Sequence, residues 1–126
     1  MGMGEAVTVA GLGCRRGVSV AAVLAAVEAA RGGRRLDALA TVQAKCGEPA
    51  LAEAARRLGL PLLVGAVADG DPRLISRSAA SRAATGSGSA SEAAALAAAG
   101  PAARLVGPRL ALGPVTCAIA VGEDGA

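Results

Sequence analysis

The chain has no aromatic side chain and no histidine, and only one of its 13 basic residues is a lysine. Without aromatic rings, the protein cannot stack nucleic-acid bases as RNA-recognition sheets and OB-folds do. Without histidine, it has no Ser-His-Asp triad, no imidazole metal site and no histidine ligand for haem. These absences exclude several common forms of RNA binding, hydrolysis and metal chemistry.

A long apolar run is also missing, although 53 % of the 126 residues are hydrophobic. A membrane span requires roughly 18 to 20 uninterrupted apolar residues, and the longest candidate, residues 18–30, contains Glu28. Much of the apolarity is alanine, which forms helices but buries little surface. Residues 1–5 carry no basic group, so we expect no signal peptide. We therefore expect one domain over residues 1–126 and no membrane partner.

Neither the charge nor the cysteines point to a nucleic-acid or metal partner. The net charge is +3, and the arginines are spread along the chain rather than gathered in a block, so we expect no nucleic-acid partner. Cys14, Cys46 and Cys117 form no C-x-x-C pair, so we expect no metal site and no cofactor. An odd count without an export signal predicts free thiols and a cytoplasmic location. Cys117, in an apolar strand, is expected in the core.

The hydrophobic pattern alternates between strands and helices. Ser19 can cap a helix over residues 20–31, Pro49 can open one that ends at Gly59, and an alanine-rich helix ends at Gly100. A weaker helix is predicted over residues 73–84. Predicted strands cover residues 6–10, 39–43, 61–67, 104–106 and 115–121. This order predicts an α/β fold, a single-domain three-layer α/β/α sandwich with a mixed, mostly parallel sheet.

The first motif, V-T-V-A-G-L-G-C-R-R-G-V-S, covers residues 7–19 and is the most informative stretch. An apolar strand leads into glycines, which let a ligand approach the backbone closely. The arginine pair and the N-terminus of the next helix favour an anion. The candidate ligand-binding residues are Gly11, Gly13, Cys14, Arg15, Arg16 and Gly17. A plain tight turn with two solvated arginines would show the same pattern.

The second motif is the loop at residues 44–49, which contains Lys45 and Glu48. Lys45 is the single lysine in a chain otherwise biased to arginine, and a lysine is a compact charge that can give up a proton when desolvated. Glu48 lies three residues on and could pair with it or sit at the helix start. An ordinary surface lysine beside a first-turn acid is the alternative.

The third motif is a Gly/Ser loop at residues 85–89, directly before the alanine-rich helix. Ser89 and Glu92 fit a capping box, and hydroxyl and N–H groups at a helix N-terminus also suit an anion. The candidate ligand-binding residues here are Gly86, Ser87, Ser89 and Glu92. Because such loops gather at one edge of an α/β sheet, we expect all three motifs to form one crevice.

These blocks resemble the CobE/CbiG C-terminal domain family of cobalamin biosynthesis. The resemblance rests on G-L-G-C-R-R-G-V-S, K-C-G-E-P, T-G-S-G-S-A-S-E-A-A-A-L and V-T-C-A-I-A, which together span nearly the whole chain. It implies an α/β fold and a role in building the corrin ring. CbiG proteins open a lactone on a cobalt-precorrin and release acetaldehyde. The chain departs from the usual pattern at Cys46, Gly47 and Ala90, which leaves the fold expectation unchanged.

The resemblance implies a corrinoid or precorrin ligand, and the residues agree with it. Precorrins carry many carboxylates on a large flat macrocycle, which suits arginines, a lysine and helix N-termini. Without aromatic residues, the macrocycle would pack on aliphatic side chains. If the protein is an enzyme, Lys45 and Glu48 are the catalytic candidates. The alternative is a non-catalytic module that holds an intermediate or docks on another enzyme of the pathway.

Overall fold

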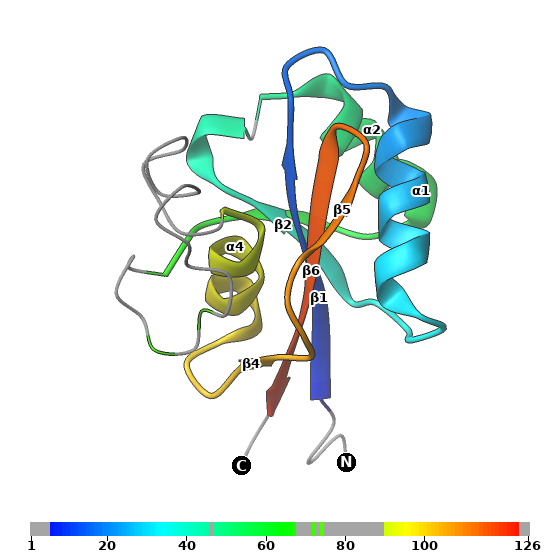
Figure 1. Cartoon of the computed structure of the whole chain (residues 1–126). Helices are drawn as coiled ribbons and strands as arrows, with labels where there is room; N and C mark the ends of the chain where they lie inside the picture. Colours follow the sequence, from blue (N-terminus) through cyan, green and yellow to red (C-terminus); the bar gives the residue numbers. More distant parts are fainter. Residues whose placement is uncertain (1–5, 46, 68–71, 73, 75–89, 124–126) are drawn as a thin grey trace.

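The structure, a computed structural model, describes residues 6–45, 47–67, 72, 74 and 90–123. Figure 1 shows a sheet between helices. The elements are β1 (Ala6–Cys14), α1 (Val20–Arg31), β2 (Ala38–Thr41), the 3₁₀ turn η1 (Gln43–Lys45), α2 (Pro49–Leu58), β3 (Leu62–Val64), α4 (Ala90–Ala99), β4 (Arg104–Leu105), β5 (Leu110–Leu112) and β6 (Val115–Glu123).

The six described strands form one mixed sheet in the order β3-β2-β1-β6-β4, and β5 also pairs with β6. The pairings β1–β2 and β2–β3 are parallel, whereas β6 is antiparallel to β1, β4 and β5. The mixed sheet is confirmed, but the expected predominance of parallel pairing is wrong for the described strands. For β5 and β6 the reason is local, because residues 113–114 join them directly and so short a connection permits only antiparallel pairing.

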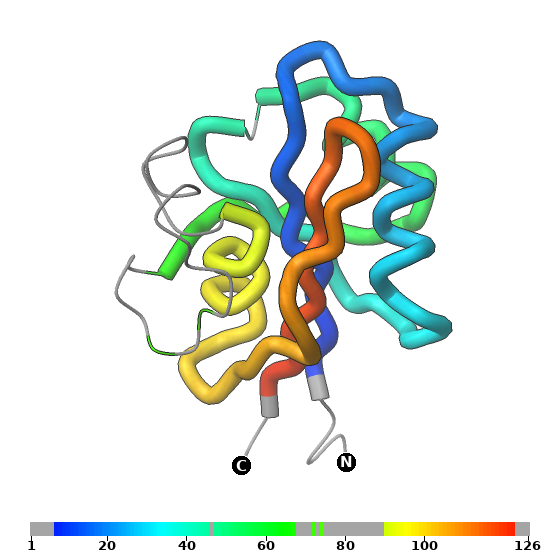
Figure 2. Tube along the Cα trace, in the orientation of Figure 1, coloured from blue at the N-terminus to red at the C-terminus, as the bar shows by residue number. Residues whose placement is uncertain are grey.

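Helices cover both faces of the sheet, as predicted (Figure 2). Two successive βαβ units, β1–α1–β2 and β2–α2–β3, place α1 and α2 on one face. Val23 and Val27 of α1 and Leu51 of α2 are fully buried there. On the other face α4 packs across β1, β6 and β2. The chain therefore folds into the three layers that its alternating pattern predicts.

The predicted helix boundaries are confirmed for α1 and α2. The Ser19 hydroxyl oxygen accepts a hydrogen bond of 3.1 Å from the Ala22 N–H, which satisfies one of the open donors at the start of α1. Pro49 opens α2, where its missing N–H costs no hydrogen bond. Gly59, with φ 70°, ends α2 in a left-handed conformation that glycine adopts readily.

The first strand is longer than predicted, because residues 11–14 continue β1 rather than belonging to a loop. All nine residues of β1 pair with β6. Gly11 lies under α4, where an added Cβ would overlap the Ser91 carbonyl oxygen and lie 2.8 Å from the Ala95 Cβ. Gly122 of β6 likewise faces the Ala99 carbonyl. These two glycines let α4 approach the sheet closely, which accounts for Gly11 without a ligand.

Other departures are small. The second and third strands are shorter than predicted, and β5 was not predicted because its three residues lie between a proline and a glycine. Cys117 is 1 % exposed, as expected for a core residue, and both described cysteines are free. The predicted helix over residues 73–84 lies outside the described residues except for Leu74. None of the described helices is long and apolar enough to span a bilayer.

Candidate functional site

The second motif is held by three consecutive turns of the backbone. The Lys45 N–H donates to the Val42 carbonyl at 2.9 Å, and the Glu48 N–H donates to the Lys45 carbonyl at 3.0 Å. The Leu51 N–H then donates to the Glu48 carbonyl at 3.1 Å, inside α2. This ladder fixes Lys45 and Glu48 in a short, tight connection that follows the carboxyl end of β2.

A hydrogen bond joins the first and second motifs. Glu48 is the N-cap residue of α2, but its side chain makes no capping bond to that helix. Instead, the Gly17 N–H donates to Glu48 Oε2 at 2.8 Å. Gly17 has φ 79°, a left-handed conformation that the turn requires and that glycine adopts without strain. The expected convergence of these two loops is therefore confirmed.

Cys14 lies close to the joined loops, and the charges of the second motif act on its thiol. Its side chain is half-buried at the end of β1, not in an exposed loop. Burial raises the pKa of the Cys14 thiol, the Glu48 carboxylate raises it further, and the Lys45 ammonium lowers it. The Gly17–Glu48 hydrogen bond brings the loop after Cys14 to Glu48, and the Glu48 N–H bonds to the Lys45 carbonyl. We call Cys14, Lys45 and Glu48 the thiol–lysine–glutamate cluster.

Of the two roles that the sequence left open for Glu48, the structure shows the position at the helix start, and no Lys45–Glu48 ion pair is found among the described residues. One oxygen of the Glu48 carboxylate is held by Gly17 instead. The three salt bridges of the described part of the chain involve glutamates 28 and 53. Lys45 is half-buried and is in none of these ion pairs. The Lys45 ammonium therefore lies in the same cluster as the Cys14 thiol and a carboxylate that is already held by Gly17.

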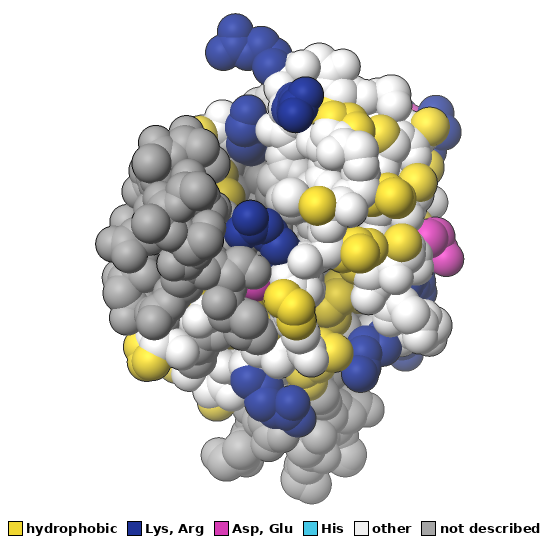
Figure 3. Space-filling model, in the orientation of Figure 1, with side chains coloured by type: hydrophobic (Ala, Val, Ile, Leu, Met, Phe, Trp, Pro, Cys, Tyr) yellow, Lys and Arg dark blue, Asp and Glu magenta, His cyan; other side chains and the backbone are white. Residues whose placement is uncertain are grey.

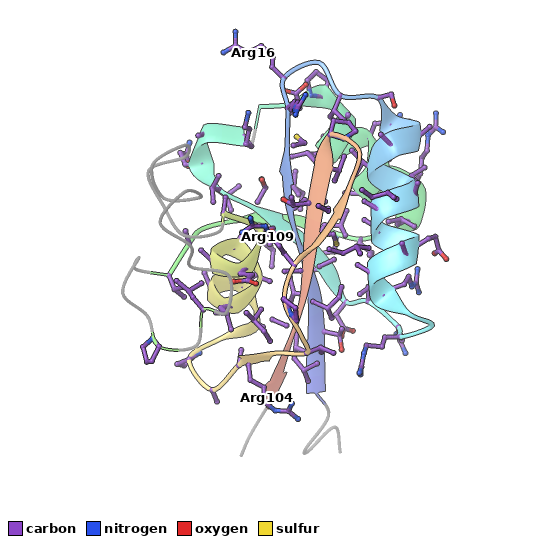
Figure 4. All side chains as sticks on the ribbon, in the orientation of Figure 1. Arg16, Arg104 and Arg109 are labelled. Carbon is purple, nitrogen blue, oxygen red and sulfur yellow. The ribbon has the colours of Figure 1, made fainter. Side chains whose placement is uncertain are left out.

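The loop that follows β1 is anchored on its other side by the β5–β6 hairpin. The Arg15 N–H donates to the Pro114 carbonyl at 3.1 Å. The side chains of Arg15 and Arg16 are exposed, and Figure 4 shows Arg16 extending away from the body of the protein. The loop thus has a fixed backbone and carries two cationic side chains at its rim.

Gly13 lies one position before Cys14, opposite Thr116 of β6. A Cβ on Gly13 would lie 2.7 Å from Thr116 Oγ1. The Thr116 hydroxyl donates weakly to the Gly13 carbonyl, at 3.5 Å. Contact with Thr116 accounts for glycine at this position, and a ligand contact at Gly11 or Gly13 stays a prediction.

The third motif is described only from α4 onward, and Gly86, Ser87 and Ser89 lie outside the described residues. Glu92, in the first turn of α4, is fully buried. Its Oε2 accepts a hydrogen bond of 3.0 Å from the Arg109 N–H. Figure 4 shows Arg109 beside α4. Sequence reasoning missed Arg109 because it lies between strands and belongs to no motif.

The arrangement suits a carboxylate-bearing ligand. Lys45, Arg15 and Arg16 supply cations around the carboxyl ends of β1 and β2, the edge where open α/β sheets bind ligands. Glu48 supplies a carboxylate that could accept a proton. Within the described part of the chain, no group of three or more His, Cys, Asp or Glu side chains could hold a metal ion.

Comparisons with known proteins decide the family. A family profile described as Cobalamin synthesis G C-terminus matches residues 8–120. This chain belongs to that family. No curated protein sequence matches the chain significantly.

Two crystal structures of cobalamin biosynthesis proteins are similar to this one. CobE, a protein from the cobalamin (vitamin B12) biosynthetic pathway, is 37 % identical, with a TM-score of 0.82 over 96 % of this chain and 94 % of that chain. The cobalamin biosynthesis protein chiG from Agrobacterium tumefaciens is 48 % identical, with a TM-score of 0.71 over 94 % of this chain and 100 % of that chain. Both the family and the α/β fold that the motifs implied are therefore confirmed.

Proposed function

We propose that this protein binds a precorrin-type intermediate of cobalamin biosynthesis at the thiol–lysine–glutamate cluster, and that Lys45 and Glu48 assist the opening of a lactone on it. The observation that carries the proposal is the hydrogen bond from Gly17 to Glu48, which joins the two motifs into one site. Family membership supports the pathway, and the charges of the site support the ligand class.

The charge of the site favours an acid-rich ligand. Lys45 is half-buried and in no salt bridge among the described residues, so a ligand carboxylate would meet an ammonium group with reduced access to water. Arg15 and Arg16 add forked donors at the rim, which fit carboxylates bidentately. A precorrin presents several acetate and propionate groups and could engage more than one of these cations.

The proposed chemistry is hydrolysis of the lactone ester. Glu48 would accept a proton from water through Oε1, because Oε2 is held by the Gly17 N–H. The water oxygen then bonds to the lactone carbonyl carbon, and the ring C–O bond breaks as the proton held by Glu48 passes to the leaving oxygen. The products are a hydroxyl group and a carboxylic acid, which ionises to a carboxylate by releasing its proton to water, and Glu48 is again a carboxylate. The Lys45 ammonium would stabilise the negative charge that develops on the carbonyl oxygen.

The alternative function is a binding module without turnover, and one observation favours it. Burial and Glu48 both raise the pKa of Cys14, so this thiol stays protonated near neutral pH and is a poor nucleophile. In the described part of the site, catalysis would therefore depend on Glu48 as the base. A module of this kind would hold the intermediate or dock on another enzyme of the pathway.

The binding proposal is tested by titrating the protein with a series of corrin intermediates at fixed salt and following the visible spectrum. Lys45→Ala should weaken binding by about 1.5–3 kcal/mol, the usual value of a charge-assisted hydrogen bond. Lys45→Arg should also bind less well, because the guanidinium is larger and differently shaped. Arg104→Ala is the matched control, since it removes one exposed cation at β4 (Figure 4).

Unchanged affinity in Lys45→Ala would make this lysine an ordinary surface residue. If Lys45→Ala and Arg104→Ala lose the same affinity, the loss would come from the change in net charge and not from a contact made by Lys45. Turnover separates the two functions: with a lactone-bearing precorrin, the enzyme hypothesis predicts product formation that Glu48→Gln abolishes while binding persists. Binding without product in the wild-type protein would support the module instead.

A further inference from the structure

An apolar surface lies on the sheet edge formed by β5. Leu110 and Leu112 of β5 are 37 % and 42 % exposed, and Val106, just before them, is 42 % exposed. Figure 3 shows hydrophobic side chains running down the face over β5 and α1, with Lys and Arg side chains above them. We call Val106, Leu110 and Leu112 the β5 apolar edge.

This edge is continuous with the candidate site. Cys14 of β1 pairs with Val115 of β6, and Val115 pairs with Leu112 of β5. Directly paired residues project to the same face of a sheet, so Cys14, Val115 and Leu112 form one row across three strands. Neighbouring strands lie roughly 4.8 Å apart, which places Leu112 about 10 Å from Cys14, on the face that α1 and α2 cover.

The backbone links the same two regions. The Arg15 N–H bonds to the carbonyl of Pro114, in the connection between β5 and β6. A cavity of about 190 Å³ lies between the last turn of α1 and residues 106–110, and its lining includes Val106, Leu110 and Cys117. The β5 apolar edge thus extends from the hollow at the last turn of α1 to the loop of Arg15 and Arg16, which is bonded to the β5–β6 connection.

We propose that the β5 apolar edge is the aliphatic platform on which the face of the macrocycle packs, while the cations of the site bind its peripheral carboxylates. This inference rests on the proposed function. A corrin-type ligand has an apolar face and a fringe of carboxylates, and the protein has no aromatic ring on which to stack it. Exposed leucines next to an arginine loop match that combination of groups.

The flanking residues argue against a second strand as the occupant. Pro108 and Pro114 lie on either side of β5, and neither has an N–H to donate to an added strand. Proline at a short edge strand is a common way of preventing edge-to-edge pairing. The edge is therefore protected against extension of the sheet, while its leucine side chains remain open to a flat ligand.

The test uses two probes, a corrin with free acetate and propionate groups and the same corrin with these groups converted to amides. Leu112→Ser should weaken binding of both probes by roughly tenfold, because the lost contact is apolar. Lys45→Ala should weaken binding of the acid probe alone. Leu63→Ser is the matched control, since Leu63 is 39 % exposed on β3, at the opposite edge of the sheet.

The outcomes separate the two proposals. If wild-type protein binds the acid corrin, but Leu112→Ser binds as tightly as Leu63→Ser, the platform is overturned and the proposed function stands. If wild-type protein binds neither probe, both fail. If sedimentation shows a dimer that Leu112→Ser dissociates, the edge is a contact between copies and the platform is also overturned. Thermal melts of each variant confirm that it folds.

Discussion

Replacing Gly11 with alanine tests the close packing of α4 on the sheet. The added Cβ would overlap the Ser91 carbonyl and lie 2.7 Å from the Ala95 backbone nitrogen. Both obstacles belong to a helix backbone, which cannot move aside as a flexible side chain can. Overpacking usually costs about 1–3 kcal/mol, and because α4 must shift as a unit we expect a loss of about 3 kcal/mol or slightly more.

This loss of stability should cause a large fall in the melting temperature. An unfolding entropy of about 2.1 cal/mol/K per residue converts 3 kcal/mol into a fall of about 10 °C in Tm for a domain of this size. The chain has no tryptophan or tyrosine, so unfolding is best followed by far-ultraviolet circular dichroism in heat and in urea. The urea midpoint should fall with little change in slope.

Gly107→Ala provides the control, because a Cβ there would meet nothing within 4 Å and its φ is not positive. The stability of this variant should change by less than about 1 kcal/mol. If Gly11→Ala is as stable as Gly107→Ala, then α4 does not pack as closely as described. Gly11 would then need another explanation, such as the ligand contact.

Two further predictions concern the thiols. In a Cys46→Ser background, Glu48→Gln should lower the pKa of Cys14 and speed the reaction of this thiol with a disulfide reagent at pH 8. Lys45→Ala should raise the pKa of Cys14 and slow the same reaction. Equal reaction rates in the two variants would contradict the cluster. Burial raises the pKa of Cys117 to about 12 from 9.0. As the pH rises, the thiol of the unfolded chain therefore ionises before that of the folded chain, and this favours unfolding. The free energy of unfolding should fall between pH 9 and 12, by up to about 1.4 kcal/mol per pH unit. Cys117→Ala should show a shallower fall in urea titrations across this range, and an identical fall would refute the assignment.

Local signals in the sequence predict much of the fold. Ser19, Pro49 and Gly59 set the ends of α1 and α2 through contacts within a few residues, and such contacts are visible in any local pattern. The extension of β1 and the existence of β5 could not be predicted in this way. The extension of β1 depends on pairing with β6, about a hundred residues later in the chain. The strand β5 pairs with β6 across a short local turn, but its three residues between Pro108 and Gly113 are too few to show a strand pattern.

The candidate site was also predictable only in part, because distant contacts decide the partners of its residues. The spacing of Lys45 and Glu48 suggests a pair, yet Glu48 bonds to Gly17, a residue 31 positions earlier. The glycines of the first motif suggest a ligand-binding loop, yet Gly11 faces α4 and Gly13 faces Thr116. A sequence pattern shows which residue types occur, but it does not show which of several partners each will meet once the strands pair.

The nine-residue register between β1 and β6 has a consequence for how this fold can be joined to other chains. Ala6 pairs with Glu123 at one end, and Cys14 pairs with Val115 at the other. The two ends of the register are separated by roughly 27 Å along the strands. Figure 1 shows the start of β1 and the end of β6 side by side, opposite the loop that leads into α1. A domain joined directly before β1 or directly after β6 would therefore begin at the end of the sheet opposite to Lys45 and Glu48, and a short linker between Ala6 and Glu123 would allow circular permutation.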